Sequence, residues 1–321
     1  MLGGMLLAAF GAIAFSGKAI IVKLAYRHGV DATTLIALRM AVALPFFALI
    51  ALWVHARSGL APLQRGDAWK IAVLGFLGYY LASFLDFLGL AYITATLERL
   101  ILYLNPTLVL LITIVAFKRS ASGRQMLALA ASYLGVVLAF GHDFALAGNA
   151  GAGAIALGSV LVFASALVYA IYLVGSGELV RRIGPVRLTA YASCVASLAC
   201  IAQFALTRPL ASALAWPLPV YWLSLANGIV CTVLPVFSVM MAVSRIGAPT
   251  ASQIGMIGPV STILLSSVFL GEAMGPWQIA GTALVMVGVF IVSRSGPAAA
   301  QPATETTSER TAEHNVKGAT T

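Results

Sequence analysis

The chain has 321 residues, of which 61% are hydrophobic and only 9% are charged, and its formal net charge is +9. Average soluble domains contain about a quarter charged residues, so this composition excludes an ordinary soluble protein and indicates an integral membrane protein. The basic residues fall mainly in short stretches between apolar runs, which favours a role in membrane orientation over nucleic-acid binding.

Ten apolar segments follow one another along the chain, and each is long enough to cross a bilayer. They lie at about 3–25, 32–54, 69–91, 95–117, 124–141, 152–175, 188–206, 219–241, 250–270 and 276–293. The sequence therefore predicts an all-α integral membrane protein with ten transmembrane helices. The remaining stretch, 294–321, is rich in Thr, Glu and Ala, and we predict a disordered cytoplasmic tail there.

The first four segments carry five charged residues at a similar depth. At about 1.5 Å per residue, all five lie within roughly 5–11 Å of the membrane surface opposite the N-terminus. A charge in lipid costs about 2.5–3.5 kcal/mol or more, so these side chains are expected to face the protein interior, one another or water. The five residues are Lys18, Arg39, Asp86, Glu98 and Arg99.

Two interpretations of this charge cluster remain open. In the structural one, Asp86 and Glu98 neutralise two of the three cations and hold the first four helices together. In the functional one, the excess positive charge binds a carboxylate or phosphate, and an acidic residue carries a coupling proton. Glu98 is the preferred proton carrier, because it precedes the Asn105-Pro106 break in the same segment and shares a helix face with Asn105.

The fourth segment recurs in the ninth, about 150 residues later. Sliding one onto the other aligns Pro106 with Pro259 and Asn105 with Gly258. Proline removes a backbone donor and crowds the preceding turn, so we predict that each helix breaks at this point. Carbonyl groups freed within a membrane survive only against protein or a water-filled cavity. Interrupted helices at matching places in two halves are typical of a transporter's binding site.

Matching small residues extend this repeat into the following helices. Ala128 and Gly135 in the fifth segment correspond to Gly281 and Gly288 in the tenth. Each pair is seven residues apart and therefore lies on one helix face, where small residues let transmembrane backbones approach closely. Chance recurrence among glycines and alanines is the alternative explanation.

Five helices per half is an odd number, so the second half would enter the membrane from the opposite side. We therefore predict two inverted five-helix repeats, residues 1–143 and 144–293, joined by an external loop at Asp143–Gly151. With the N-terminus in the cytoplasm, thirteen Lys and Arg residues face the cytoplasm and three face the other side. This bias predicts a multi-pass protein of the cell's inner (plasma) membrane with both termini cytoplasmic.

Other polar residues are weaker candidates for lining a cavity. Gln253 precedes the break in the ninth segment, and Asn227 lies in the eighth. Glu272 lies at the outer mouth, where a role in the turn between the ninth and tenth helices is favoured over substrate binding. Four tyrosines deep in the membrane could either line the cavity or pack in the core: Tyr79, Tyr80, Tyr169 and Tyr172.

These features resemble the EamA-type members of the drug/metabolite transporter superfamily over roughly residues 3–293. The resemblance is carried by Pro106, Pro259, Leu270-Gly271-Glu272 and the stretch LDFLGLAYITATLERLILYLNP. The first-half copy departs from the family pattern, with Lys118-Arg119 where Gly-Glu often stands. The resemblance implies a ten-helix inverted-repeat fold that moves small metabolites, commonly amino acids and often outward, through a central cavity.

The chain contains no Gly-rich phosphate loop with a lysine and no HExxH motif, and its three cysteines lack metal-ligand spacing. No enzyme activity, cofactor or metal is therefore expected. We predict a secondary active transporter that exports a small polar metabolite, such as an amino acid, by alternating access around a central cavity. Its expected partners are this substrate, the lipid bilayer and a proton as candidate coupling ion, and no nucleic acid. The alternative is a membrane-embedded enzyme or sensor that uses the charge cluster; a channel would need a continuous polar stripe.

Overall fold

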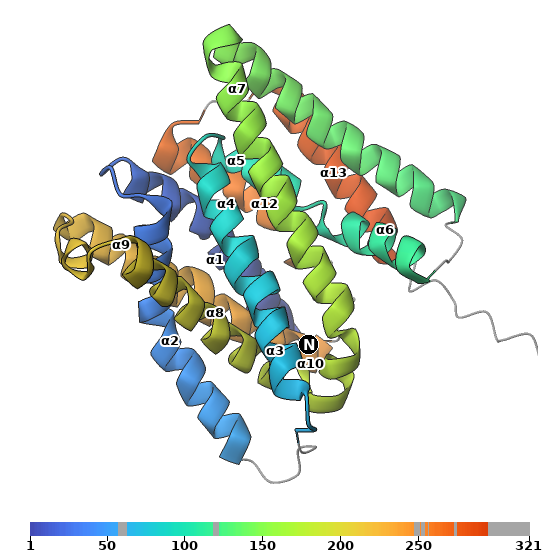
Figure 1. The fold of residues 1–321 in the computed structure, drawn as a ribbon. Coiled ribbons are helices and arrows are strands. Elements are labelled where there is room, and N and C mark those ends of the chain that lie inside the picture. The colour runs from blue at the N-terminus through green and yellow to red at the C-terminus, as the bar shows by residue number, and fades with distance from the viewer. Residues whose placement is uncertain are drawn as a thin grey trace, which may run out of the picture.

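The computed structural model describes residues 1–56, 63–117, 122–246, 251, 254–255, 257–272 and 275–294. All regular secondary structure in these ranges is helical, which confirms the predicted all-α fold. The helices form a bundle in which segments far apart in the chain lie side by side (Figure 1). The predicted tail, apart from Arg294, lies outside the described residues.

The helices follow the predicted segments closely. Eight are long and apolar enough to cross a membrane, and two shorter apolar helices, Ile257–Leu270 and Pro276–Ile291, complete the ten. The elements are α1 (Leu2–Tyr26), α2 (Ala32–Ala56), α3 (Asp67–Gly75), η1 (Phe76–Leu81), α4 (Ala82–Leu90), α5 (Ala95–Leu102), α6 (Asn105–Phe117), α7 (Gly123–Ile183), α8 (Pro185–Thr207), η2 (Leu210–Leu214), α9 (Leu218–Gly228), η3 (Ile229–Val233), α10 (Leu234–Ile246), α12 (Ile257–Leu265), η4 (Ser266–Leu270) and α13 (Pro276–Arg294).

Helix α7 contains two of the predicted segments. Its backbone is helical from Gly123 to Ile183, so the predicted loop at Asp143–Gly151 is wrong. This stretch contains alanines and a leucine, which favour helix, and glycines, which disfavour it, but no proline to break the helix. Figure 1 shows α7 as two rods that meet in a sharp turn at one end of the molecule. The apolar spans Gly123–Gly141 and Gly151–Ile183 form the two rods, so the chain still crosses twice.

The predicted break in the fourth segment is confirmed. Helix α5 ends at Leu102, and α6 begins at Asn105, directly before Pro106. In the ninth segment, Gly258 and Pro259 lie in the first turn of α12. A proline is tolerated in a first turn because its missing N–H would have no partner within the helix. Pro106 therefore begins a new helical piece, and Pro259 lies in the first described turn of α12.

Two π-helical stretches occupy equivalent places in the third and eighth spans. They are η1, Phe76–Leu81, and η3, Ile229–Val233. The residue offset that relates Pro106 to Pro259 also relates Phe76 to Ile229. Such π-helical stretches often mark functional positions. The sequence analysis did not predict them.

A glycine precedes each π-helical stretch and permits a close helix crossing. A Cβ on Gly75 would lie 2.6 Å from the carbonyl oxygen of Ala192, and one on Gly228 would lie 3.0 Å from that of Arg39. Ala192 and Arg39 are related by the same offset, so the third span packs on α8 as the eighth packs on α2. The internal repeat, first recognised in the fourth and fifth segments and their counterparts, therefore also includes the third and eighth spans.

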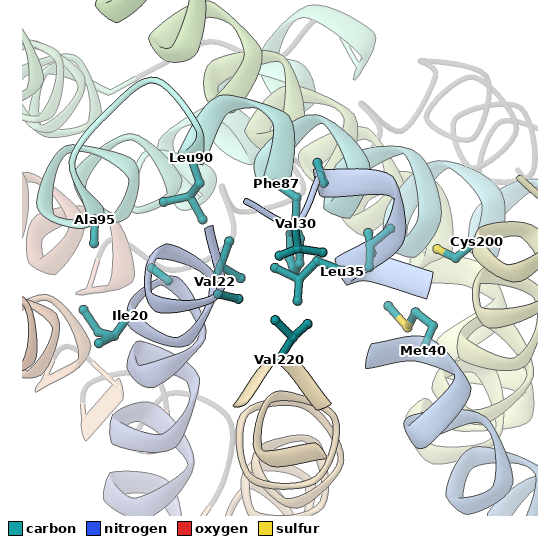
Figure 2. Packing of buried hydrophobic residues seen from close by; sticks show 14 residues of the cluster. Ile20, Val22, Val30, Leu35, Met40, Phe87, Leu90, Ala95, Cys200 and Val220 are labelled. Carbon is teal, nitrogen blue, oxygen red and sulfur yellow. The ribbon is translucent and has the colours of Figure 1, made fainter. Parts of the chain in front are cut away.

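An apolar core closes the end of the bundle opposite the start of α1. Figure 2 shows Val22, Leu35, Phe87 and Leu90 converging with Val220 of α9. The first four of these side chains are fully buried. The charge cluster borders this core. Each of three charged residues directly precedes a core residue in the chain: Lys18 precedes Ala19, Arg39 precedes Met40 and Asp86 precedes Phe87.

The two small-residue faces, which the sequence predicts to permit close backbone approach, pack against each other. A Cβ on Gly135 of α7 would lie 2.5 Å from the carbonyl oxygen of Gly281, and one on Gly288 of α13 would lie 2.6 Å from that of Ala128. Because these neighbours are backbone atoms, they cannot move aside as a side-chain end can.

We expect Gly135→Ala to lower the free energy of unfolding by about 1–3 kcal/mol, the usual cost of overpacking. Gly141→Ala on the same helix is the matched control, because nothing lies within 4 Å of its added Cβ. That control should be neutral or slightly stabilising. Thermal unfolding of the purified variants in one detergent measures both, and equal melting temperatures would contradict the close crossing.

Candidate functional site

A cavity of about 540 Å³ lies between the helices of both predicted halves. This volume is within the range of about 300–1,000 Å³ typical of small-molecule sites. Its lining includes six of the residues predicted for the site: Lys18, Arg39, Asp86, Arg99, Asn105 and Pro106.

The other predicted residues are placed differently. Glu98 and Asn227 are completely buried behind the lining. Gly258 and Pro259 are buried at the start of α12. Gln253 lies outside the described residues.

One ammonium group brings three helices together. Lys18 Nζ on α1 lies 2.5 Å from Asp86 Oδ2 on α4 and 3.1 Å from Glu98 Oε1 on α5. The Lys18 side chain is 12% exposed and that of Glu98 is fully buried. Taking these groups out of water is expensive, and their mutual attraction offsets that cost only in close geometry. Both acids therefore pair with Lys18, and not with two of the three cations as the structural interpretation expected.

Arg39 is held by uncharged partners. Its Nε donates to Thr232 Oγ1 at 2.8 Å, and its guanidinium lies 5.2 Å from the ring centroid of Phe87. Thr232 belongs to η3 and in turn donates to the backbone carbonyl of Asn227. Among the described residues, Nη1 of Arg39 has no hydrogen-bond partner. Thr232 was not a sequence candidate, because a lone threonine in an apolar segment gives no distinctive signal.

Arg99 is held in a similar way. Its Nη2 donates to Ser16 Oγ at 2.9 Å, and its guanidinium lies 5.5 Å from the ring centroid of Tyr103. Ser16 Oγ is also 2.8 Å from the carbonyl oxygen of Gly258. The contact between Arg99 and Ser16 therefore connects α5 to the broken ninth span through α1. Neither Ser16 nor Tyr103 was predicted for the site.

Tyr103 explains why glycine stands before the second proline. Its hydroxyl donates to the backbone carbonyl of Gly255 at 2.7 Å. A Cβ on Gly258 would overlap the Tyr103 hydroxyl, so a larger residue would displace the Tyr103 side chain from its present position. At the first break, the Asn105 side-chain amide donates to the Leu102 carbonyl at 2.8 Å and satisfies a group that the break leaves unpaired.

The tyrosines divide between the cavity and the core. Tyr79 and Tyr169 line the cavity, and Tyr172 packs behind both, with ring centroids 5.2 and 5.5 Å away. Tyr80 instead stacks on Phe84. The cavity thus has an aromatic wall on the side of η1 and α7.

Glu272 does not act within its own turn, as the sequence suggested, but caps α5. Its Oε1 accepts the backbone N–H of Ala95 at 2.9 Å, and its Oε2 accepts that of Thr96 at 3.3 Å. The hydroxyl of Thr94 accepts the N–H of Leu97 at the same helix end. Free amides and the helix dipole both favour a carboxylate there. The corresponding first-half residue, Arg119, lies outside the described residues.

The model of the EamA-like transporter family matches residues 2–141 and 156–294. The uncharacterized transporter YcbK of Bacillus subtilis is 33% identical over 295 residues, covering 90% of this chain and 91% of the relative. An uncharacterized transporter of Archaeoglobus fulgidus is 23% identical over 288 residues, covering 90% and 96%. A solved crystal structure of a protein shares the fold, with a TM-score of 0.62 at 19% identity and coverage of 92% and 99%.

The shared ammonium predicts an unequal response to removing the acids. Glu98→Gln and Asp86→Asn each leave Lys18 one carboxylate, whereas the double variant leaves this buried cation without either. We expect the double variant to lose about 3–5 kcal/mol of stability, the usual cost of an orphaned buried charge. The single variants should each lose much less.

Adding Lys18→Met to the double variant should recover most of the lost stability, because it removes the orphaned charge. Thermal unfolding and expression yield of the four variants measure the effect. If Lys18→Met destabilises the double variant further, the shared pairing is not what holds these helices.

Proposed function

Because the chain belongs to the EamA-like transporter family, we propose that it is a secondary active transporter of a small polar metabolite, such as an amino acid, in the cell's inner (plasma) membrane. It is a multi-pass membrane transporter and not an enzyme. The observation that carries the proposal is the cavity of about 540 Å³ that presents Lys18, Arg39, Asp86 and Arg99 within an otherwise apolar bundle. Charges at this depth are costly and mark substrate or ion pathways.

The arrangement of the cavity supports alternating access. Its lining runs from Ala8, near the start of α1, to Lys18. Beyond Lys18 the buried core of Figure 2 closes the path, with Val22 and Leu35 completely buried. A transporter needs a closed end of this kind on one side of its site, and the opposite half-cycle must open it. We infer export as the direction, in line with the outward transport that the family resemblance implies.

We infer that the two halves, residues 1–143 and 144–293, are inverted repeats and that both termini are cytoplasmic. The two matches of the family model support this division. The equivalent π-helical stretches η1 and η3 support it independently. The bias of Lys and Arg toward one side supports the orientation.

The orientation predicts a specific labelling pattern. A reporter fused after Arg294 should read cytoplasmic, and Asn149→Cys, between the two apolar spans of α7, should react with a membrane-impermeant maleimide in intact cells. A substitution is preferred to an insertion there because the backbone of α7 is helical. Reaction of Asn149→Cys only after permeabilisation, together with an external reporter, would reverse the assigned orientation.

Transport itself is tested by counterflow in proteoliposomes, with a panel of amino acids, amines, carboxylates and nucleosides. We expect exchange of one chemical class above the level of protein-free liposomes. Absence of exchange for every class would reject the transporter proposal.

A proton is the proposed coupling ion, carried by Asp86 and Glu98. Protonation of one acid leaves the other paired with Lys18, so the site tolerates both states. For the exchanged class, we expect a pH gradient to drive accumulation by the wild type. Glu98→Gln should keep counterflow and lose this accumulation, because the amide keeps the shape and cannot release a proton. Retained accumulation would exclude Glu98 as the carrier.

A further inference from the structure

The membrane-embedded charges near the cavity do not cancel. Three are cationic, Lys18, Arg39 and Arg99, and two are acidic, Asp86 and Glu98. Of the ten acidic residues in the sequence, the others lie near helix ends, in connecting segments or in the tail, and Glu272 is engaged in capping α5. With all groups ionised, the site therefore carries one uncompensated positive charge.

The excess belongs to the arginines and not to the lysine. Both acids contact Lys18 Nζ, whereas neither Arg39 nor Arg99 has a carboxylate within salt-bridge distance among the described residues. Each arginine is instead held by one hydroxyl and one aromatic ring: Thr232 with Phe87, and Ser16 with Tyr103. Such partners orient a guanidinium without neutralising it.

Donor groups of both arginines remain unused. Arg39 is only 5% exposed and lines the cavity, yet its Nη1 has no partner among the described residues, and Nε of Arg99 also has none. A buried cation without a counter-charge is costly, and the planar guanidinium fork matches the two oxygens of a carboxylate. The unused donors and the charge excess thus indicate the same kind of ligand.

Resting on the transport function proposed above, we propose that the substrate is an organic monoanion whose carboxylate binds Arg39 and Arg99. One negative charge balances the one excess positive charge. A zwitterionic amino acid fits less well, because its ammonium group would have to compete with Lys18 for Asp86 and Glu98. The substrate is therefore a carboxylate of net negative charge, which is a narrower class than polar metabolites in general.

The rest of the lining suits an apolar body on that carboxylate. Phe15, Phe47, Tyr79 and Tyr169 line the cavity together with aliphatic residues. Such a wall offers burial to a hydrocarbon or aromatic group, and the lining hydroxyls of Ser165 and Thr232 already donate to backbone carbonyls of the protein itself. The proposal thus commits to a monocarboxylate with an apolar body and not to a phosphate ester or inorganic anion.

The test is binding by the full-length protein in detergent, read as a shift in melting temperature. Four probes share one carbon skeleton: 3-phenylpropionate, its neutral amide, 3-phenylpropylamine and zwitterionic phenylalanine; inorganic phosphate is the fifth. A ligand that binds only the folded state raises the melting temperature, and we expect about 2–4 °C for saturating 3-phenylpropionate. The other four should give no more than a quarter of that shift.

Variants locate the binding site. Arg39→Gln and Arg99→Gln should each abolish the shift with 3-phenylpropionate. Both should fold, because each substitution removes a charge that has no carboxylate partner. Arg208→Gln is the matched control and should keep the full shift, since Arg208 lies outside the cavity and pairs at the surface with Asp31 at 3.5 Å.

Several results would overturn the monoanion proposal: no shift with 3-phenylpropionate, an equal shift with the amide, the amine or phenylalanine, or a full shift in both arginine variants. Counterflow separates this failure from failure of the transport proposal. Exchange of amines or amino acids without anion binding would reject the monoanion and keep the transporter. Anion binding at the arginines without exchange of any class would keep the anion site and reject transport.

Discussion

The pairing of Lys18 with two carboxylates is the interaction on which the rest of the site depends. Asp86 and Glu98 come from α4 and α5 and meet the same Nζ on α1. Because an unpaired charge at this depth is costly, these three helices are constrained to present their charges to one point. The apolar core of Figure 2 then packs beside that point. Because both acids pair with Lys18, Arg39 and Arg99 line the cavity without a carboxylate partner among the described residues.

Symmetry holds for several features of the backbone, although η4 at Ser266–Leu270 has no π-helical counterpart in α6, and it fails for the charges. The prolines of the fourth and ninth spans, the π-helical stretches η1 and η3, and the crossings at Gly75 and Gly228 all follow one offset. The counterparts of Lys18 and Arg39 under that offset are Ile171 and Ala192. A shared backbone architecture suits two halves that exchange roles during transport, whereas a substrate site requires one asymmetric set of groups. In place of charges, the second half contributes hydrogen-bond acceptors: Thr232 Oγ1 for Arg39 and the Gly255 carbonyl for Tyr103.

The sequence was sufficient for features that depend on hydropathy and on proline. Ten spans, the break at Pro106 and the common depth of the five charges follow from segment length and backbone chemistry. The pairing of Asp86 and Glu98 with Lys18 could not be predicted, because a common depth does not determine which cation each acid contacts. Thr232 and Ser16 were missed because a hydroxyl in an apolar helix usually bonds its own backbone. The π-helical stretches were missed because η1 contains no proline, and the continuous helix across Asp143–Gly151 because that stretch lies between the apolar segments 124–141 and 152–175.

Glu272 links the second half of the chain to α5 of the first half by hydrogen bonds. Its carboxylate accepts two backbone N–H groups at the start of α5. Separating Glu272 from α5 would leave this carboxylate and the two amides to be rehydrated. The break between Leu102 and Asn105 lies at the other end of the same short helix. A movement that bends the chain at this break and carries α5 together with Glu272 preserves the cap. It also changes the position of Glu98 and Arg99 relative to Lys18 and Ser16. Movement of α5 would therefore open the closed end of the cavity and change the pairing of the charged residues together.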